Sequence, residues 1–368
     1  MLTKFEVQNF KSFKDSFVFD LSETKNYEFN SKCLSNGIVN KALIYGANGC
    51  GKSNLGFAIF DLVSHLTDKQ FNPENYRNYL NAESEEVAAR FVYSFRFDES
   101  VLEYSYGKIA FGSIAWERLT INGDDIVIYH YGEPIQINLK GTETLNTDLS
   151  GSKISAIKYI KNNAVLKKNK TNDVFKAFLS FVDSMLFFRC LEVNYYLGYQ
   201  TENNSITEDI LQKGHLCEFE AFLNKAGVDC KLGLVESNGK EDIAFMFGEK
   251  SLAFWDAASS GTRSLTLFYY WLQRLREESS VSFVFIDEFD AYYHHKLSKL
   301  IVTELKTIQS QVILTTHNTS IMSNDLLRPD CYFLMQNNKI QPLYKFTDKE
   351  LRNAHNIEKM YKAGAFDG

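Results

Sequence analysis

The sequence predicts an α/β fold with a mostly parallel sheet, an antiparallel β lobe and a helical insertion. A short apolar strand, a glycine-rich turn and an amphipathic helix follow one another over residues 42–66. Alternation typical of antiparallel strands runs over 86–139, and apolar strands alternate with helices again after residue 260. We therefore expect two halves of one unit at 1–139 and 236–368, separated by a mainly helical insertion at 140–235.

Composition bounds the class of protein. Of 368 residues, 45% are hydrophobic and 23% charged, which excludes a disordered or fibrous chain. The net charge of -6 argues against a surface that is basic throughout, so any nucleic-acid contact must be local. Six cysteines form no C-x-x-C pair and no uncharged run reaches the length of a membrane helix, so we expect a cytoplasmic protein without membrane contact.

The elements are expected in this order. Residues 2–10 and 17–22 alternate as a β-hairpin at a sheet edge, and the strand at 42–45 precedes the first long helix. Within the antiparallel segment, N-G-D-D makes Asp124 and Asp125 turn residues before anything else. Apolar segments at 174–190 and 206–227 read as helices, and no heptad repeat supports coiled-coil arms. Helices at 261–278 and 296–307 then alternate with strands at 281–286 and 312–315.

A phosphate-binding loop lies between the strand at 42–45 and the helix that follows. The residues that match G-x-x-x-x-G-K-[ST] are Gly46, Ala47, Asn48, Gly49, Cys50, Gly51, Lys52 and Ser53. Glycines let backbone N–H groups wrap a β-phosphate, and the helix N-terminus favours the anion. We expect Lys52 to reach the β- and γ-phosphates, Ser53 to ligate Mg²⁺ and Asn54 to contact the nucleotide. The alternative is a flexible turn with a surface lysine, which would need neither the strand before the glycines nor the helix after them.

Two carboxylates end the apolar strand F-V-F-I-D-E. A buried strand that delivers an acid at its carboxyl end is how P-loop proteins hold Mg²⁺, which assigns Asp287 to the metal. Glu288 is then the base that orients the attacking water. Alone, such a pair is more often a solvated turn, so the assignment depends on its partners.

Two further motifs resemble one family. Ala258-Ser259-Ser260-Gly261-Thr262-Arg263 opens a helix 28 residues before Asp287, counted from Ser259, and T-T-H-N ends a strand 30 residues after it, counted to His317. This order resembles the ABC-type P-loop ATPases of the OLD, RecF and SMC-like branch. It looks most like stand-alone ATPases of bacterial phage-defence operons of the abortive-infection and retron-associated kinds. V-Q-N-F-K-S-F, L-L-R-P-D and M-Y-K-A-G-A-F add to the resemblance, which covers the first 60 residues and about 250–368.

The resemblance implies roles at the matching positions. Ser259 and Gly261 would contact the γ-phosphate of ATP bound by another subunit, and Asp290 would contact that subunit. His317 would hydrogen-bond the γ-phosphate and sense hydrolysis. Lys11 would lie near the nucleotide, or is a plain edge-strand lysine.

The sequence also departs from the family pattern. Ala258 replaces the usual leucine, Ser260 and Thr262 replace glycine and glutamine, and His295 stands where proline is common. Gln70 is the nearest candidate by order for the Q-loop glutamine, although a loop residue is the better interpretation.

A run of lysines makes one segment basic, with Asp173 as the only acid between its ends. Its members are Lys153, Lys158, Lys161, Lys167, Lys168, Lys170 and Lys176. Such a segment indicates a face for nucleic acid or an acidic partner, or else a solvated helix face.

The leading functional hypothesis is an ATPase that forms a homodimer around ATP and Mg²⁺ and drives or restrains a separate effector protein. A nucleotide-gated scaffold that restrains a toxin is an alternative, with Tyr195, Tyr196 and Tyr199 as surface candidates. A RecF-like DNA-repair ATPase is another, and a transporter motor is the weakest. Only 51 residues follow His317, without an acidic constellation, so we expect no nuclease domain in this chain.

Overall fold

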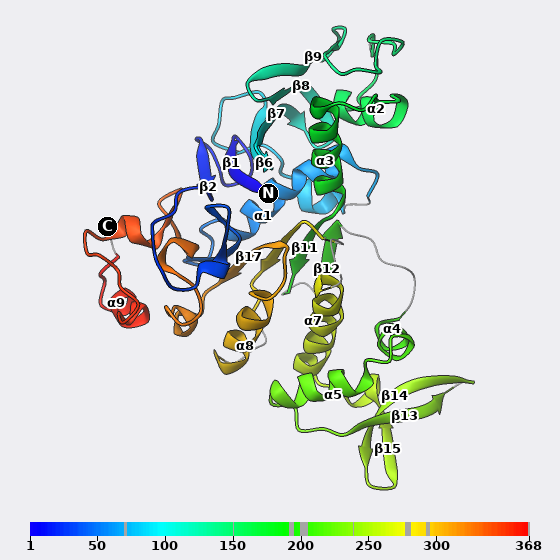
Figure 1. The fold of residues 1–368 in the computed structure, drawn as a ribbon, viewed down its shortest axis with the longest axis vertical. Coiled ribbons are helices and arrows are strands. Elements are labelled where there is room, and N and C mark those ends of the chain that lie inside the picture. The colour runs from blue at the N-terminus through cyan, green and yellow to red at the C-terminus, as the bar shows by residue number, and fades with distance from the viewer. Residues whose placement is uncertain are drawn as a thin grey trace.

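The computed structural model describes residues 1–69, 72–149, 151–190, 195–198, 205–237, 239–276, 281–291 and 295–366. A central, mostly parallel sheet lies between an antiparallel lobe and two long helices, and a small sheet lies beyond those helices (Figure 1). Within the described residues no helix combines the length and the apolar character that crossing a bilayer requires.

The central sheet has the strand order β12-β11-β16-β17-β5-β18-β19. The five inner strands are parallel, and both edge strands are antiparallel to their neighbours. The strands are β5 (Lys41–Gly46), β11 (Met185–Arg189), β12 (Tyr195–Gly198), β16 (Phe283–Asp287), β17 (Gln311–Thr316), β18 (Tyr332–Gln336) and β19 (Lys339–Pro342). Helices cover both faces, which explains why β16 and β17 are buried at every position.

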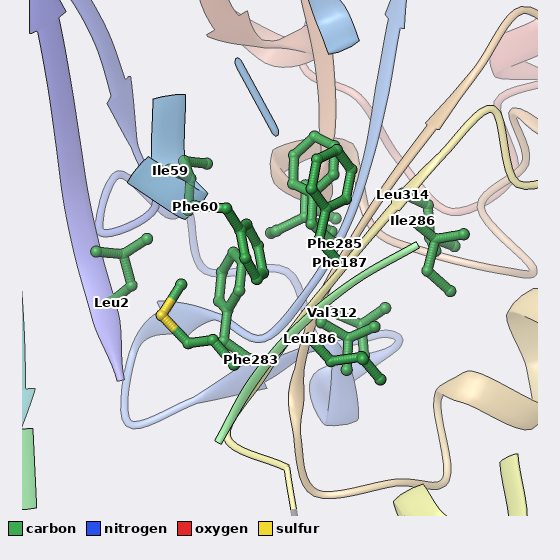
Figure 2. Packing of buried hydrophobic residues seen from close by; sticks show 14 of the residues in the cluster. Leu2, Ile59, Phe60, Leu186, Phe187, Phe283, Phe285, Ile286, Val312 and Leu314 are labelled. Carbon is green, nitrogen blue, oxygen red and sulfur yellow. The ribbon is translucent and has the colours of Figure 1, made fainter. Parts of the chain in front are cut away.

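Side chains of β11 alternate between the two faces of this sheet. On one face Phe187 packs against Phe60 of α1 (Lys52–Leu66), with ring centroids 5.1 Å apart. On the other face Phe188 lies 5.1 Å from Trp271 of α7 (Ser260–Arg276). Figure 2 shows the first face with Phe283 and the second with residues such as Leu186 and Ile286. Helix α8 (His295–Leu305) follows β16 and starts at the departure position His295.

The antiparallel lobe has the strand order β10-β9-β8-β7-β6-β1-β2. Its strands are β1 (Leu2–Gln8), β2 (Phe17–Asp20), β6 (Ala89–Phe97), β7 (Ser100–Ala110), β8 (Ser113–Ile121), β9 (Asp124–His130) and β10 (Gln136–Ile137). The predicted edge hairpin is the pair β1 and β2. Asn122 and Gly123, at φ 53° and 89°, form the tight turn of the expected hairpin, and Asp124 and Asp125 are the first residues of β9 instead of turn residues.

The remaining helices and strands lie outside these two large sheets. The helices are α2 (Ala156–Asn163), α3 (Lys170–Asp183), α4 (Ile206–Gln212), α5 (Leu216–Lys225), α6 (Phe254–Ala257) and α9 (Ile357–Lys362). The strands are β3 (Leu34–Ser35) and β4 (Ile38–Val39), and the small sheet consists of β13 (Leu232–Ser237), β14 (Lys240–Phe247) and β15 (Lys250–Ala253). None of the described helices exceeds the 17 residues of α7, and none forms a coiled-coil arm.

The middle segment contains the helices α2, α3, α4 and α5, but it is more than the helical insertion that we expected. Strand β11 pairs with β16 in the central sheet, so 140–235 supplies a strand of the core itself. A run of apolar residues this short fits a buried strand as well as a helix, and its periodicity cannot distinguish them. Helix α3 packs on the antiparallel lobe, where Phe178 and Phe181 lie 5.3 and 5.2 Å from Phe95.

One buried amide joins the two large sheets. Gln311, at the start of β17, is 1% exposed. Its Nε2 donates to the carbonyls of Leu2 and Val39, each at 2.9 Å, and its Oε1 accepts from the Leu2 N–H at 3.0 Å. The side chain therefore satisfies three backbone groups from two other strands.

Replacing this amide tests the connection. Gln311→Leu leaves the three backbone groups without partners, and we expect the free energy of unfolding to fall by about 3 kcal/mol. Chemical denaturation measures it, with Gln136→Leu on the exposed surface of β10 as control. Equal stability of the two variants would contradict the role of Gln311.

Candidate functional site

The glycine-rich turn connects β5 to α1 as its motif predicts. Gly49 and Gly51 have φ angles of 77° and 104°, a region that glycine adopts without strain. A Cβ on Gly46 would lie 2.6 Å from both the Met335 carbonyl and the Cys50 Sγ, so no larger residue fits there. Asn48 lies on the exposed part of the turn. The turn thus lies at the N-terminus of α1, where backbone N–H groups favour an anion.

Lys52 is nearly buried at the start of α1. Its Nζ donates to the carbonyls of Gly46 and Ala47 at 3.0 and 3.2 Å, and it lies 2.9 Å from Nε2 of His317. The ammonium is therefore held by its own loop, at the mouth of the site. Phosphate oxygens can replace these neutral acceptors with stronger, charge-assisted bonds.

Asp287 ends β16 with its side chain buried. Thr315 donates its hydroxyl to Asp287 Oδ1 at 2.7 Å, and Ser53 of α1 is a second hydrogen-bond partner. Burial raises the pKa of Asp287, and the bonds from Ser53 and Thr315 oppose this rise. A buried carboxylate beside a hydroxyl is a suitable oxygen pair for Mg²⁺, whose charge would compensate the burial.

Glu288 lies in the left-handed region at φ 51°, and its N–H donates to the Thr315 hydroxyl at 2.8 Å. The same threonine thereby positions both carboxylates. Glu288 Oε1 is 2.9 Å from His317 Nε2, which is also the atom near Lys52. When Nε2 carries a proton it donates to Glu288, and when it does not it accepts from Lys52. His317 thus connects the two predicted catalytic groups.

Asp290 follows the carboxylate pair. Its Oδ1 accepts from the Thr316 hydroxyl at 2.7 Å, whereas its buried Oδ2 has no hydrogen-bond partner among the described residues. Burial raises the pKa of Asp290, and hydrogen bonds from Thr316 and Asn318 act against the rise. One carboxylate oxygen is therefore still available to a donor from elsewhere.

The signature motif lies apart from this cluster. Ser259 caps α7, because its Oγ accepts from the Thr262 N–H at 3.2 Å. Ser259 and Ser260 are exposed, and Gly261 is half-buried. Figure 1 shows α7 running from the small sheet toward the central sheet. At 17 residues the helix is about 25 Å long, so it carries Ser259 and Gly261 away from the end that leads to β16.

The turn that contains Lys11 lies against the phosphate loop. The Ser12 hydroxyl accepts from Asn54 Nδ2 at 2.9 Å and also lies 2.9 Å from the place of a Cβ on Gly51. Lys11 itself donates to the Asn75 carbonyl at 2.7 Å and lies outside any strand. Its position beside the loop favours the nucleotide interpretation over an edge-strand lysine.

Sequence reasoning missed the end of β11. In the parallel register Arg189 is the partner of Asp287, and the Cys190 N–H donates to the Asp287 carbonyl at 3.2 Å. Both residues therefore lie beside the carboxylates. The available signal was the apolar run M-L-F-F at 185–188 followed at once by polar residues, which is how a buried strand ends at a site.

The basic segment is partly neutralised in the fold. Lys158, Lys161 and Lys167 form ion pairs with Asp68, Asp183 and Glu143, acids that lie outside the segment. The excess positive charge that the sequence suggested is therefore smaller at the surface.

Some predicted residues cannot be placed. Gln70 and Tyr199 lie outside the described residues, as do the side chains of Tyr195 and Tyr196.

Comparisons with known proteins give the following likenesses. The SMC head domain from Thermotoga maritima is 15% identical, covers 93% of this chain and 98% of its own, and has a TM-score of 0.45. The Smc head domain with a coiled coil and joint from Pyrococcus yayanosii is 13% identical, with coverages of 98% and 99% and a TM-score of 0.47. A SmcHead bound to the C-winged helix domain of ScpA is 16% identical, with coverages of 92% and 96% and a TM-score of 0.48.

No curated protein matches the sequence. Residues 41–323 match the family model AAA_21, described as "AAA domain, putative AbiEii toxin, Type IV TA system".

The thiol of Cys190 offers a direct test of the charge at this site. Burial and then the carboxylates of Asp287, Asp290 and Glu288 raise the pKa of Cys190 to about 12. Because alkylation needs the thiolate, we expect Cys190 to react with iodoacetamide at pH 8 more than about 100-fold slower than the exposed Cys217. Peptide mass spectrometry over a time course measures both rates. Equal rates would contradict the half-buried, acidic environment of Cys190.

Proposed function

Because this chain belongs to the AAA_21 family, we propose that it binds ATP with Mg²⁺ and hydrolyses it. The expected α/β fold with a mostly parallel sheet and an antiparallel lobe is confirmed, and the family match supports the expected ATPase domain. ATP binding is implied by the family, whereas hydrolysis, the metal and the partners are the proposal.

The observation that carries the proposal is the meeting of Lys52, His317 and Glu288 through one imidazole nitrogen. The γ-phosphate of ATP would replace the loop carbonyls and His317 as the hydrogen-bond partner of Lys52. His317 would then lie between that phosphate and Glu288. Glu288 then orients a water for in-line attack and accepts its proton. Ser53 and Asp287 would hold Mg²⁺, which supplies charge stabilisation to the phosphates.

We further propose that two copies bind head to tail around ATP. Ser259 and Gly261 lie at the exposed N-terminus of α7, at the opposite end of the helix from the one that leads to β16. Backbone N–H groups at this terminus suit a γ-phosphate presented by another subunit. The Oδ2 of Asp290, which has no hydrogen-bond partner within the described part of the chain, is a suitable acceptor for a donor from that subunit. Hydrolysis would remove the shared phosphate and open the dimer.

The output would act on a separate effector protein in bacterial anti-phage defence. The family description names a putative toxin of a toxin–antitoxin system, which supports an ATPase that drives or restrains such an effector. A scaffold that restrains a toxin with little turnover is the second candidate, and the same description favours it. Slow hydrolysis that accelerates only with the effector would distinguish the scaffold from a motor.

A RecF-like function on DNA has less support. It relied on the lysines from Lys153 to Lys176, three of which are paired with acids from other segments. Binding of DNA that weakens steeply with salt would restore this alternative.

Two substitutions separate binding from hydrolysis. Lys52→Ala removes the charge that holds the phosphates, and we expect ATP binding to be lost. Glu288→Gln removes the base but no phosphate ligand, so ATP binding is retained while kcat falls about 100-fold or more. Isothermal titration and a phosphate-release assay measure these effects.

Matched variants control for surface charge. Lys168→Ala and Glu133→Gln change exposed residues and should behave as the wild type. Light scattering should show Glu288→Gln as a dimer with Mg-ATP and a monomer without it. If Glu288→Gln stays monomeric with Mg-ATP, the ATP-bound dimer is refuted. ATP hydrolysis is tested separately by the phosphate-release assay.

A mixing experiment tests whether each site uses two subunits. Ser259→Arg blocks the signature surface, so neither it nor Lys52→Ala should hydrolyse ATP alone. In a head-to-tail dimer of one copy of each, one site keeps both an intact Lys52 and an intact Ser259. We expect the mixture to regain hydrolysis in the phosphate-release assay. If Ser259→Arg alone is fully active, the signature does not act across subunits.

A further inference from the structure

We infer that the antiparallel lobe holds a second anion site, a recess that binds a small phosphomonoester of the nucleoside monophosphate kind. The recess lies between the last turns of α1, the β7–β8 turn and the start of α2. None of the residues that line it belongs to the phosphate loop or to the carboxylate cluster. The inference therefore goes beyond the proposed ATPase function and does not depend on it.

The ionisable side chains around the recess are all basic. They are Lys108, Lys153, Lys158 and His65. No acid lines the recess within the described part of the chain. Its volume of about 190 Å³ is many times the ~10–15 Å³ that one water molecule needs, so a phosphate group has room there. A concave surface with charges of one sign attracts a ligand of the opposite sign.

Lys108 forms the floor of the recess. It is 2% exposed and lies on β7, where the register with β8 shifts on both sides of it, an irregularity that re-aims a side chain. Its Nζ donates to Asp61 Oδ2 at 2.6 Å, and Asp61 also accepts the hydroxyls of Tyr79 and Tyr106. Because an ammonium has three donors, Lys108 can add a bond to a ligand and keep its bond to Asp61.

Lys153 and Lys158 form the rim, and both belong to the basic segment that the sequence presents. The Lys158 Nζ donates to the Thr67 carbonyl at 3.0 Å and lies 2.6 Å from the Asp68 carboxylate. The Asp68 side chain is 85% exposed, so this ion pair contributes little and a phosphate can replace it. Lys153 is exposed, and its ammonium has no ion-pair partner among the residues that the structure describes.

A second buried network holds the floor in place. His65 and Ser155 line the recess, and both bond to Glu117 Oε1, at 2.8 and 2.6 Å. The other carboxylate oxygen of Glu117 accepts from the Ala156 N–H at 2.5 Å. Glu117 itself does not line the recess, and its charge is already shared among these donors. The floor is therefore arranged before a ligand arrives, which lowers the cost of binding.

Another part of the wall is apolar. Its members are Phe111, Ile114 and Ile154. The Phe111 ring stacks on Tyr76, with centroids 4.4 Å apart and an interplanar angle of 17°, so its orientation is fixed. Cations beside an apolar wall suit a phosphate that is attached to a flat apolar group. A recess whose floor is almost fully buried favours a small molecule over a nucleic-acid backbone, which is bound along an open groove.

Thymidine 5′-monophosphate is the probe, with saturating Mg-ADP present to occupy the phosphate loop. Isothermal titration should show one molecule bound per chain, and thymidine should not bind, because the phosphate supplies the charge-assisted bonds. Lys153→Ala should weaken binding about tenfold, and the double change Lys153→Ala with Lys158→Ala should weaken it about 100-fold. Lys168→Ala, an exposed lysine of the same segment outside the recess, is the matched control and should bind as the wild type.

The opposite results would overturn the inference. Equal affinity of Lys153→Ala and Lys168→Ala would place any bound nucleotide elsewhere, and so would equal binding of thymidine and its monophosphate. Absence of binding by both thymidine 5′-monophosphate and inorganic phosphate at millimolar concentration would mean that the recess is no anion site. Tight binding of a 5′-phosphorylated oligonucleotide without binding of the monophosphate would make it a nucleic-acid contact instead.

The ATPase proposal is tested apart from this site. Titration with ATP should give the same affinity for Lys153→Ala and the wild type, because the recess shares no residue with the phosphate loop. If the wild type binds no ATP, the proposed function falls. The comparison of Lys153→Ala with Lys168→Ala still decides the second site in that case.

Discussion

The parallel register of β11, β16 and β17 is the constraint on which the site depends. Each strand runs buried across the core and ends at the same edge, so residues distant in sequence meet there. Thr315 shows how tight this coupling is, because its hydroxyl donates to Asp287 and accepts the backbone N–H of Glu288. A shift of register by one residue would turn these side chains toward the helices.

Charges of both signs are concentrated at that edge. Asp287, Glu288 and Asp290 lie close enough to raise the pKa of the Cys190 thiol, after burial, which is the largest cause. On the other side lie the cations Lys11, Lys52 and Arg189. Cations and carboxylates at one buried edge are stabilised when a Mg²⁺ ion and a triphosphate are placed between them, since each then gains a counter-charge. These charges are therefore better stabilised when a nucleotide with Mg²⁺ is bound than when it is absent.

Two of the polar contacts made by the antiparallel lobe involve β17 and the phosphate loop. Gln311 ties the antiparallel lobe to the start of β17, whose other end carries Thr316 next to His317. The turn at Lys11 ties the same lobe to the phosphate loop.

The sequence by itself determined the phosphate loop, the strand that ends in Asp287 and Glu288, the helix opened by Ser259 and the strand before His317. Each of these features is encoded by neighbouring residues, because a glycine pattern or an apolar run with a polar end determines the conformation of its own segment. Only the tertiary structure decided that β11 joins the central sheet and that Arg189 lies beside Asp287. Five apolar or polar residues carry no period long enough to separate strand from helix, and pairing partners about 100 residues apart are selected by packing of the whole core. The same holds for the lysines at 158, 161 and 167, whose acidic partners are brought to them by the fold.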